Sequence, residues 1–93
     1  MRKKIKILLV DDHQMVRSGL KLMLDQQKLY EPIVTEADNG LQAMDEILSS
    51  NYDLILLDIN LPKLDGISVI KRCKKNGIHT PILAITMHNE AHI

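Results

Sequence analysis

The clearest pattern in the chain is a set of short apolar runs that each end at polar residues. The run Leu-Ile-Leu-Leu at 54–57 is unbroken and ends in Asp58. A run this short between polar residues is typical of a strand that is buried on both faces, as in the middle of a parallel sheet. Three further runs have strand-like length: Ile5–Val10, Pro32–Ala37 and Pro81–Ile85. The second of these begins with proline and is more polar, which favours a place at the edge of the sheet.

Between the apolar runs, hydrophobic residues recur at the spacing of an amphipathic helix. We predict three helices, the first over residues 13–27, with Asp12, Asn39 and Asp65 as the residues that cap their amino ends. Gln42, three residues after Asn39, completes a capping box. The residues expected to face the sheet are Val16, Leu20, Met23 and Leu24 in the first helix, Leu41, Met44, Ile47 and Leu48 in the second, and Ile67, Ile70 and Cys73 in the third.

Strands and helices therefore alternate along the whole chain. This alternation implies right-handed crossover connections through the helices, and strands that are joined in this way lie parallel in the sheet. The expected fold class is α/β, with an open, doubly wound parallel sheet. A chain of 93 residues is enough for one small domain, so we expect residues 1–93 to form a single unit.

The composition indicates which binding partners and which cellular compartment to expect. Lys plus Arg and Asp plus Glu both number 12, so the charge gives no reason to expect binding to nucleic acid or to an anionic membrane. Cys73 is the only cysteine, which excludes an internal disulfide and suits a reducing compartment. No segment has the length and hydrophobicity of a membrane span. We therefore expect a cytoplasmic protein.

Carboxylates gather where the predicted strands end. Asp11 and Asp12 follow the first run, Asp58 ends the central run, and Thr86 follows the last. The carboxyl edge of an open α/β sheet is where ligands bind. Any one of these aspartates alone is more simply a helix cap or a loop residue, but adjacent carboxylates repel one another. A hard divalent cation such as Mg²⁺ removes that repulsion, and a carboxylate beside it can accept a phosphoryl group.

The residues around these aspartates match the motifs of a known family. They are Leu9-Val10-Asp11-Asp12-His13, Val16-Arg17-x-Gly19-Leu20, Asp58-Ile-Asn-Leu-Pro62, Asp65-Gly66 and Ala84-Ile85-Thr86. In this order and with these spacings, the whole sequence resembles the receiver domain of two-component response regulators. Its opening motifs are most similar to the subfamily whose members carry a helix-turn-helix DNA-binding domain.

The resemblance implies a flavodoxin-like sheet in the order 2-1-3-4 and the role of a phosphoacceptor switch rather than an enzyme. Asp58 would accept the phosphoryl group from a phosphohistidine on a sensor histidine kinase. Asp12 and Asp58 would bind Mg²⁺ directly, Asn60 through its backbone carbonyl, and Asp11 through a water molecule. Thr86 would hydrogen-bond a phosphoryl oxygen and report its presence. DNA binding would require an output domain outside this chain.

The family pattern continues beyond Ile93, with a fifth strand that carries a lysine and with further helices. We therefore expect a receiver domain that is incomplete at its carboxyl end. Lys63, in the loop after Asp58, is not expected to replace that lysine, so phosphorylation should be slow. The run Ile82–Thr86 would be an edge strand and one face of the sheet would be uncovered, which predicts self-association.

Other functions remain open on these residues. A phosphohydrolase similar to the haloacid dehalogenases needs Asp-x-Asp, but residues 58–60 read Asp-Ile-Asn and lack the second carboxylate. A further alternative is a non-signalling fragment that only self-associates. His88, Glu90 and His92 scramble the order of a zinc-protease motif and are a weak metal candidate, while His13 is expected at the surface.

Overall fold

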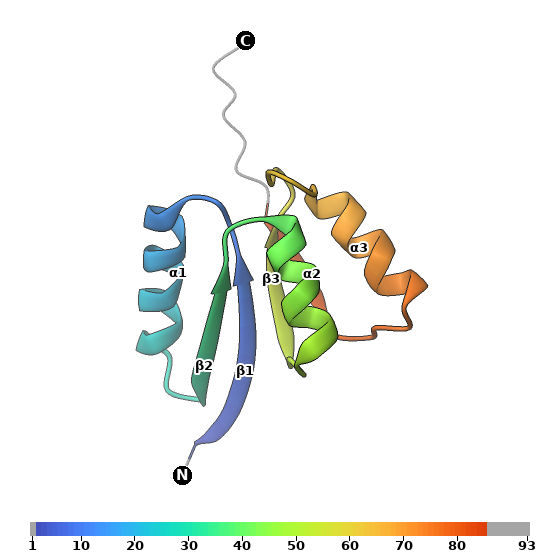
Figure 1. Cartoon of the computed structure of the whole chain (residues 1–93). Helices are drawn as coiled ribbons and strands as arrows, with labels where there is room; N and C mark the ends of the chain where they lie inside the picture. Colours follow the sequence, from blue (N-terminus) through green and yellow to red (C-terminus); the bar gives the residue numbers. More distant parts are fainter. Residues whose placement is uncertain (1, 86–93) are drawn as a thin grey trace.

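The computed structural model describes residues 2–85 of the chain. Strands and helices alternate throughout this part (Figure 1). In chain order they are β1 (Lys3–Val10), α1 (Gln14–Gln26), β2 (Tyr30–Ala37), α2 (Gly40–Ser49), β3 (Leu54–Asp58), α3 (Gly66–Lys75) and β4 (Ile82–Ile85). All strand pairs are parallel, in the order β2-β1-β3-β4, which confirms the predicted fold class and strand order.

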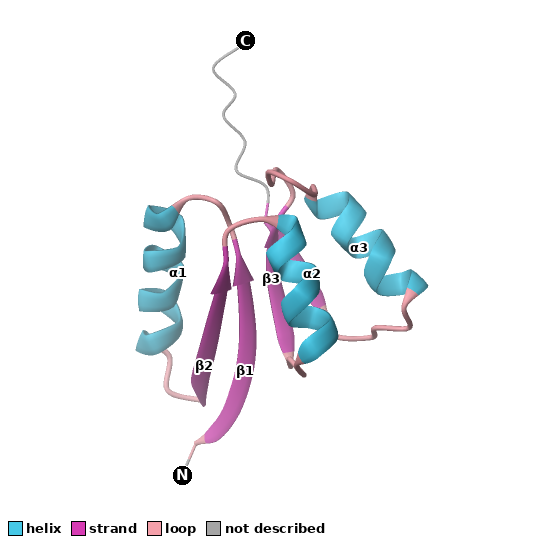
Figure 2. Cartoon of the chain, viewed as in Figure 1, coloured by secondary structure: helices cyan, strands magenta, loops and turns pink. Residues whose placement is uncertain are grey.

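The sheet separates two layers of helix (Figure 2): α1 lies on one face, and α2 and α3 lie on the other. Because successive residues of a strand point to opposite faces, each central strand contributes to both layers. Leu8 and Leu57 belong to the larger core cluster beneath α2 and α3, whereas Ile7, Leu9 and Leu56 face α1. All five side chains are buried. The strands β1 and β3 are therefore covered on both faces along these residues, as their apolar runs predict.

The helices pack on faces that differ in part from the predicted ones. Four residues that were expected to face the sheet are exposed instead: Met23, Leu41, Leu48 and Ile67. In α3 the most deeply buried side chains are Val69 and Cys73. An apolar stripe is wide enough that only its centre reaches the sheet, and tertiary packing decides which residues form that centre. No helix within residues 2–85 is long and apolar enough to cross a membrane.

The amino ends of α2 and α3 are capped as predicted. Asn39 Oδ1 accepts a hydrogen bond of 2.8 Å from the backbone N–H of Gln42, and Asp65 Oδ1 accepts one of 2.8 Å from that of Ser68. The capping box is shifted by one residue, because the Gln42 side chain accepts from the N–H of Asp38 rather than from that of Asn39. These caps fix where both helices begin: α2 begins shortly after β2, and α3 begins after the loop that follows β3.

The loop between β3 and α3 is held close to the start of α2 by two glycines. A Cβ atom at Gly66 would lie 2.6 Å from the backbone oxygen of Asp58, and one at Gly40 would overlap the backbone of Leu64. The N–H of Gly40 also donates a 3.3 Å hydrogen bond to the carbonyl of Pro62. Only glycine permits both approaches. The loop is therefore folded back beside the carboxyl end of β3.

Candidate functional site

The parallel register brings the predicted acidic residues together at the carboxyl edge of the sheet. Val10, the last residue of β1, lies beside Leu57, and Asp58 is the last residue of β3. Ligand atoms of Asp11, Asp12 and Asp58, together with one of His13, all lie within 4.8 Å of one another. The structure therefore joins Asp58 to two carboxylates that lie 46 and 47 positions earlier in the sequence.

Two of the three carboxylates are almost completely removed from solvent. Asp11 is 1% exposed and Asp58 is 2% exposed, whereas Asp12 is exposed. Burial raises the pKa of Asp58, and the charges of Asp11 and Asp12 raise it further, against the lowering effect of the Asn60 backbone N–H. The site thus accumulates negative charge in a place that water solvates poorly.

One buried oxygen atom in this cluster has no hydrogen-bond partner among residues 2–85. Asp11 Oδ1 accepts from the backbone N–H of His13 at 2.8 Å, but Asp11 Oδ2 is buried and unpaired. Buried polar atoms are rarely left unpaired, because the lost hydration costs free energy. A cation bound among the aspartates would supply the missing partner. Carboxylate oxygens with room for waters are the ligands that Mg²⁺ prefers, so the residues present fit this ion.

His13 lies against the aspartates rather than apart from them. Its Nδ1 atom is 2.9 Å from Asp11 Oδ1 and 3.0 Å from Asp12 Oδ1. The hydrogen bond with Asp11, and next the charge of Asp12, raise the pKa of the imidazole. His13 is exposed, as expected, but its contacts were not predicted. The signal for them was its place directly after the aspartate pair.

The prediction that Asp12 caps the first helix is wrong. The capping position of α1 is occupied by His13, and no side chain accepts a hydrogen bond there. The Asp12 carboxylate instead lies beside the His13 ring. The Asp12 side chain cannot both cap the helix and lie among the other carboxylates, and in this structure it lies among the carboxylates.

A second polar group, also missed from the sequence, fixes the position of Asp11. Arg17 Nη1 donates a 2.6 Å hydrogen bond to the backbone oxygen of Asp11, and Arg17 Nε forms a 2.8 Å ion pair with Glu36 Oε1. Lys21 Nζ lies 2.8 Å from the other Glu36 oxygen. Lys21, and then Arg17, hold the pKa of Glu36 below its ordinary value. The signal was the four-residue spacing of Arg17 and Lys21, which places both on one face of α1.

Two further residues were predicted to belong to the site, Asn60 and Thr86. The structure describes the first but not the second. Asn60 is exposed, and its backbone N–H donates a 3.0 Å hydrogen bond to Asp58 Oδ1. Thr86 lies outside residues 2–85, although its neighbour Ile85 is paired in register with Asp58. Lys63 adopts a positive φ of 68° in the exposed part of the loop.

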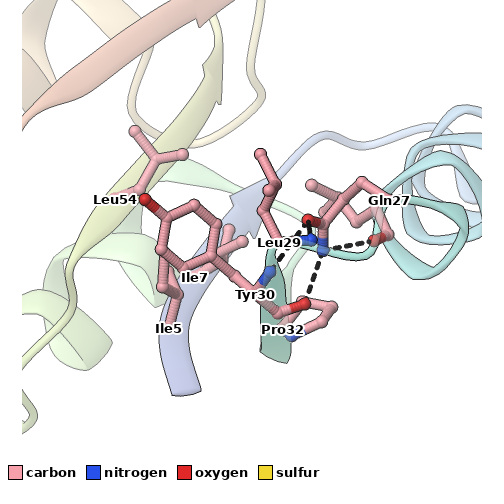
Figure 3. A pocket seen from close by; sticks show the side chains of 8 residues that line it. Ile5, Ile7, Gln27, Leu29, Tyr30, Pro32 and Leu54 are labelled. Carbon is pink, nitrogen blue, oxygen red and sulfur yellow. Dashed lines mark hydrogen bonds between the residues drawn. The ribbon is translucent and has the colours of Figure 1, made fainter. Parts of the chain in front are cut away.

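A hollow of about 360 Å³ lies at the other end of the sheet (Figure 3). Its walls are apolar side chains from the starts of β1, β2 and β3 and from α1, among them Ile5, Leu24 and Leu54. Gln27 closes one side, where its Nε2 donates a 2.7 Å hydrogen bond to the carbonyl of Tyr30 (Figure 3). Among the described residues that line it, only Tyr30 carries a titratable group.

Comparison with known proteins identifies relatives over nearly the whole chain. A model of the response regulator receiver domain matches residues 7–93. Transcriptional regulatory protein YdfI of Bacillus subtilis is 40% identical over 95% of this chain and 40% of its own length. The nitrate/nitrite response regulator protein homolog of Haemophilus influenzae is 31% identical over 94% of this chain and 41% of its own length. The chain thus spans about two fifths of these curated relatives.

Solved structures share the fold. The receiver domain of the Francisella response regulator 1452 superposes with a TM-score of 0.82 and 30% identity, over 94% of this chain and 69% of that one. Response regulator TrrA of Thermotoga maritima, solved in complex with Mg(2+)-BeF, gives a TM-score of 0.80 and 33% identity, over 99% of this chain and 75% of that one. The family-model match and these structures show that the chain belongs to the response regulator receiver domain family of two-component systems.

Proposed function

We propose that this receiver domain accepts a phosphoryl group on Asp58 from a phosphohistidine of a sensor histidine kinase. The observation that carries the proposal is the buried Asp58 carboxylate beside the unpaired Asp11 Oδ2. Both lie at the sheet edge where ligands bind in this class of fold. The domain changes state once for each phosphoryl group received, so we assign it the role of a switch in the cytoplasm rather than that of an enzyme.

Each residue of the cluster has a distinct part in this proposal. Asp12 and Asp58 would hold Mg²⁺ directly, Asn60 would hold it through its backbone carbonyl, and Asp11 would act through a water molecule. When bound, the ion neutralises the negative charge shared by the carboxylates and the transferred group. The Asn60 N–H engages Asp58 Oδ1 and so orients the carboxylate, which leaves the second oxygen for attack. Thr86, by its place in the motif, hydrogen-bonds a phosphoryl oxygen.

In the transfer step the phosphoryl group passes directly from the donor nitrogen to Asp58, and no water molecule is consumed. An ionised Asp58 oxygen attacks the phosphorus atom, and a new O–P bond forms as the P–N bond to the donor imidazole breaks. The imidazole leaves with the bonding pair and takes a proton from solvent. Burial and the charges of Asp11 and Asp12 raise the pKa of Asp58, and a cation beside it would favour the ionised form that attacks.

Intact-mass measurement with a small phosphodonor tests the proposal. Acetyl phosphate with Mg²⁺ should slowly add one phosphoryl mass to the chain, and Asp58→Asn should abolish it. Asp53→Asn is the matched control, because Asp53 precedes the same strand and its carboxylate binds the backbone N–H of Lys6 at the opposite end. Equal labelling of the Asp58→Asn variant would refute the assignment.

We further propose that the 93-residue chain associates with a second copy of itself along β4. Among residues 2–85, β4 is the outermost strand on its side of the sheet, and Leu83 and Ala84 on it are exposed. Unpaired backbone groups on such an edge favour pairing with another strand. In a longer protein that carries an output domain, contact with DNA would be made by that domain, as the transcriptional relatives suggest.

A further inference from the structure

The backbone of Asp11 is held from two sides. The hydrogen-bonded part of β1 ends at Val10, which pairs with Ala37 of β2. One residue further, the Asp11 N–H donates a 3.1 Å hydrogen bond to the Ala37 carbonyl, and the Asp11 carbonyl accepts the 2.6 Å hydrogen bond from Arg17 Nη1. Because that carbonyl belongs to the peptide group that leads into Asp12, the restraint acts on the backbone of both aspartates.

Arg17 makes this contact from a fixed position. Its Nε atom is paired with Glu36 Oε1 at 2.8 Å, and its side chain is only 16% exposed. Glu36 directly precedes Ala37 on β2, so the guanidinium and the Ala37 carbonyl hold Asp11 to the same strand. A guanidinium presents its N–H groups in one rigid plane, which lets it hold two acceptors at once. One side chain therefore joins α1, β2 and the turn between them.

Other contacts secure the amino end of α1 only weakly. In α1, which lies wholly within residues 2–85, the capping position has no side-chain hydrogen bond and no residue is fully buried. Helices α2 and α3 each have a capping side chain and buried residues. The contacts of the His13 ring are with its two preceding neighbours in the sequence. Lys21 also pairs with Glu36, but it lies one helical turn further from the aspartates than Arg17.

We propose that Arg17, held by Glu36, is a positioning residue for phosphoryl transfer: it fixes the turn that carries Asp11 and Asp12, and so sets where their carboxylates lie relative to Asp58. In this role it touches neither the phosphoryl group nor the metal ion, and it acts only through the backbone of the turn. The inference rests on the proposed function and deepens it, because it names a residue outside the acidic cluster on which the reaction depends.

Two substitutions separate positioning from charge and from stability. Arg17→Lys keeps the positive charge but offers a single nitrogen atom, which cannot hold Glu36 and the Asp11 carbonyl in the same geometry. Lys21→Gln is the matched control, because it removes the other cationic partner of Glu36 and leaves both hydrogen bonds of Arg17 in place. Positioning predicts that only the first substitution affects the reaction.

Initial rates of Asp58 phosphorylation by acetyl phosphate at saturating Mg²⁺ measure the effect, with circular dichroism to establish that each variant is folded. Arg17→Lys should be slower by about tenfold to a hundredfold, the cost of a displacement on the order of 1 Å at a reacting site. Lys21→Gln should match the unaltered chain. If Arg17→Lys does not fold, Glu36→Gln takes its place and should also be slower, because it weakens the hold on Arg17 without removing that side chain.

A measurement without metal or phosphodonor tests the restraint itself. The backbone ¹⁵N–¹H resonance of Asp12 reports hydrogen bonding to the Asp11 carbonyl, because both atoms belong to one conjugated peptide group. Arg17→Lys should shift this resonance, and Lys21→Gln should leave it in place.

The proposal is overturned if Arg17→Lys is phosphorylated at the unaltered rate, if its Asp12 resonance does not move, or if Lys21→Gln is slowed equally. Each of these outcomes leaves Asp58 labelled, so the proposed function survives it. If the unaltered chain is not labelled at Asp58, the proposed function fails, and the Asp12 resonance alone then decides whether Arg17 holds the turn.

Discussion

At the scale of single residues, the chemistry of the site comes from a conflict between charge and burial. Asp58 is buried beside two other aspartates, which raises its pKa, and Asp11 Oδ2 is buried without a partner. Both features disfavour an ionised cluster in the absence of a cation. A bound divalent ion relieves both at once. The residues therefore predict a folded state that a metal ion stabilises.

Mg²⁺ should raise the melting temperature of the chain, because it binds the folded state and relieves the repulsion among the carboxylates. Asp12→Ala should abolish the rise, since Asp12 is an exposed member of the cluster whose removal leaves the core intact. Thermal unfolding at several Mg²⁺ concentrations measures this. Asp45→Ala, which removes an exposed aspartate from α2, should keep the full rise. A melting curve that Mg²⁺ does not move would count against the site.

At the scale of elements, the sequence determines the strands more firmly than the helix faces. A run such as 54–57 is apolar throughout, so its burial does not depend on which way it is turned. Val69 and Ile67 show the opposite case, because only contact with the sheet decides which of the two faces inward. The convergence of Asp11 and Asp58 follows from parallel strands alone. The contacts of His13 and Arg17 depend on side-chain geometry that no local pattern encodes.

The rotation of α3 has a measurable consequence. Val69→Ala should lower the free energy of unfolding by about 1–3 kcal/mol, because it removes buried methyl groups and leaves a cavity. Ile67→Ala is the matched control on the same helix and should cost no more than about 0.5 kcal/mol, because Ile67 is exposed. Chemical denaturation of both variants provides the comparison. A larger loss in Ile67→Ala would mean that the predicted face of α3, rather than the observed one, packs on the sheet.

The ion pairs that join α1 to β2 should make stability depend on pH. The pKa of Glu36 is lowered from 4.5 in the folded chain, chiefly by Lys21. Its contribution to the free energy of unfolding is therefore present above that ordinary value and is lost as the pH falls through the lowered folded-state pKa. Glu36→Gln should be less stable than the unaltered chain at neutral pH, and the difference should shrink in acid. Denaturant titrations of both chains at a series of pH values measure it; a difference that is the same at every pH would exclude this ion-pair account.

At the scale of the whole molecule, the uneven covering of the sheet determines how the chain meets other molecules. In the described part, α1 alone covers one face of the sheet (Figure 1). The apolar hollow opens beside it at the starts of β1, β2 and β3 (Figure 3). The β4 edge carries the exposed Leu83. A domain of 93 residues has a small margin of stability, so exposed apolar surface of this kind favours association.

The 93-residue chain should elute from size exclusion as a species larger than a monomer, with its mass given by light scattering. Leu83→Lys should shift it toward the monomer, because a charge on an edge strand opposes pairing. Leu48→Lys is the matched control, since Leu48 on α2 is 59% exposed and Leu83 is 58% exposed. A monodisperse, cooperatively melting monomer of the unaltered chain would contradict self-association.

The central claim, that Asp58 is the phosphoacceptor, is tested most directly by locating the acyl phosphate. After treatment with acetyl phosphate and Mg²⁺, borohydride reduces a phosphorylated aspartate to homoserine and leaves unmodified carboxylates unchanged. Peptide sequencing by mass spectrometry then reads which residue was converted. The proposed site predicts homoserine at position 58 and aspartate at positions 11, 12 and 53. Homoserine at any of those three positions, with Asp58 unmodified, would contradict the assignment.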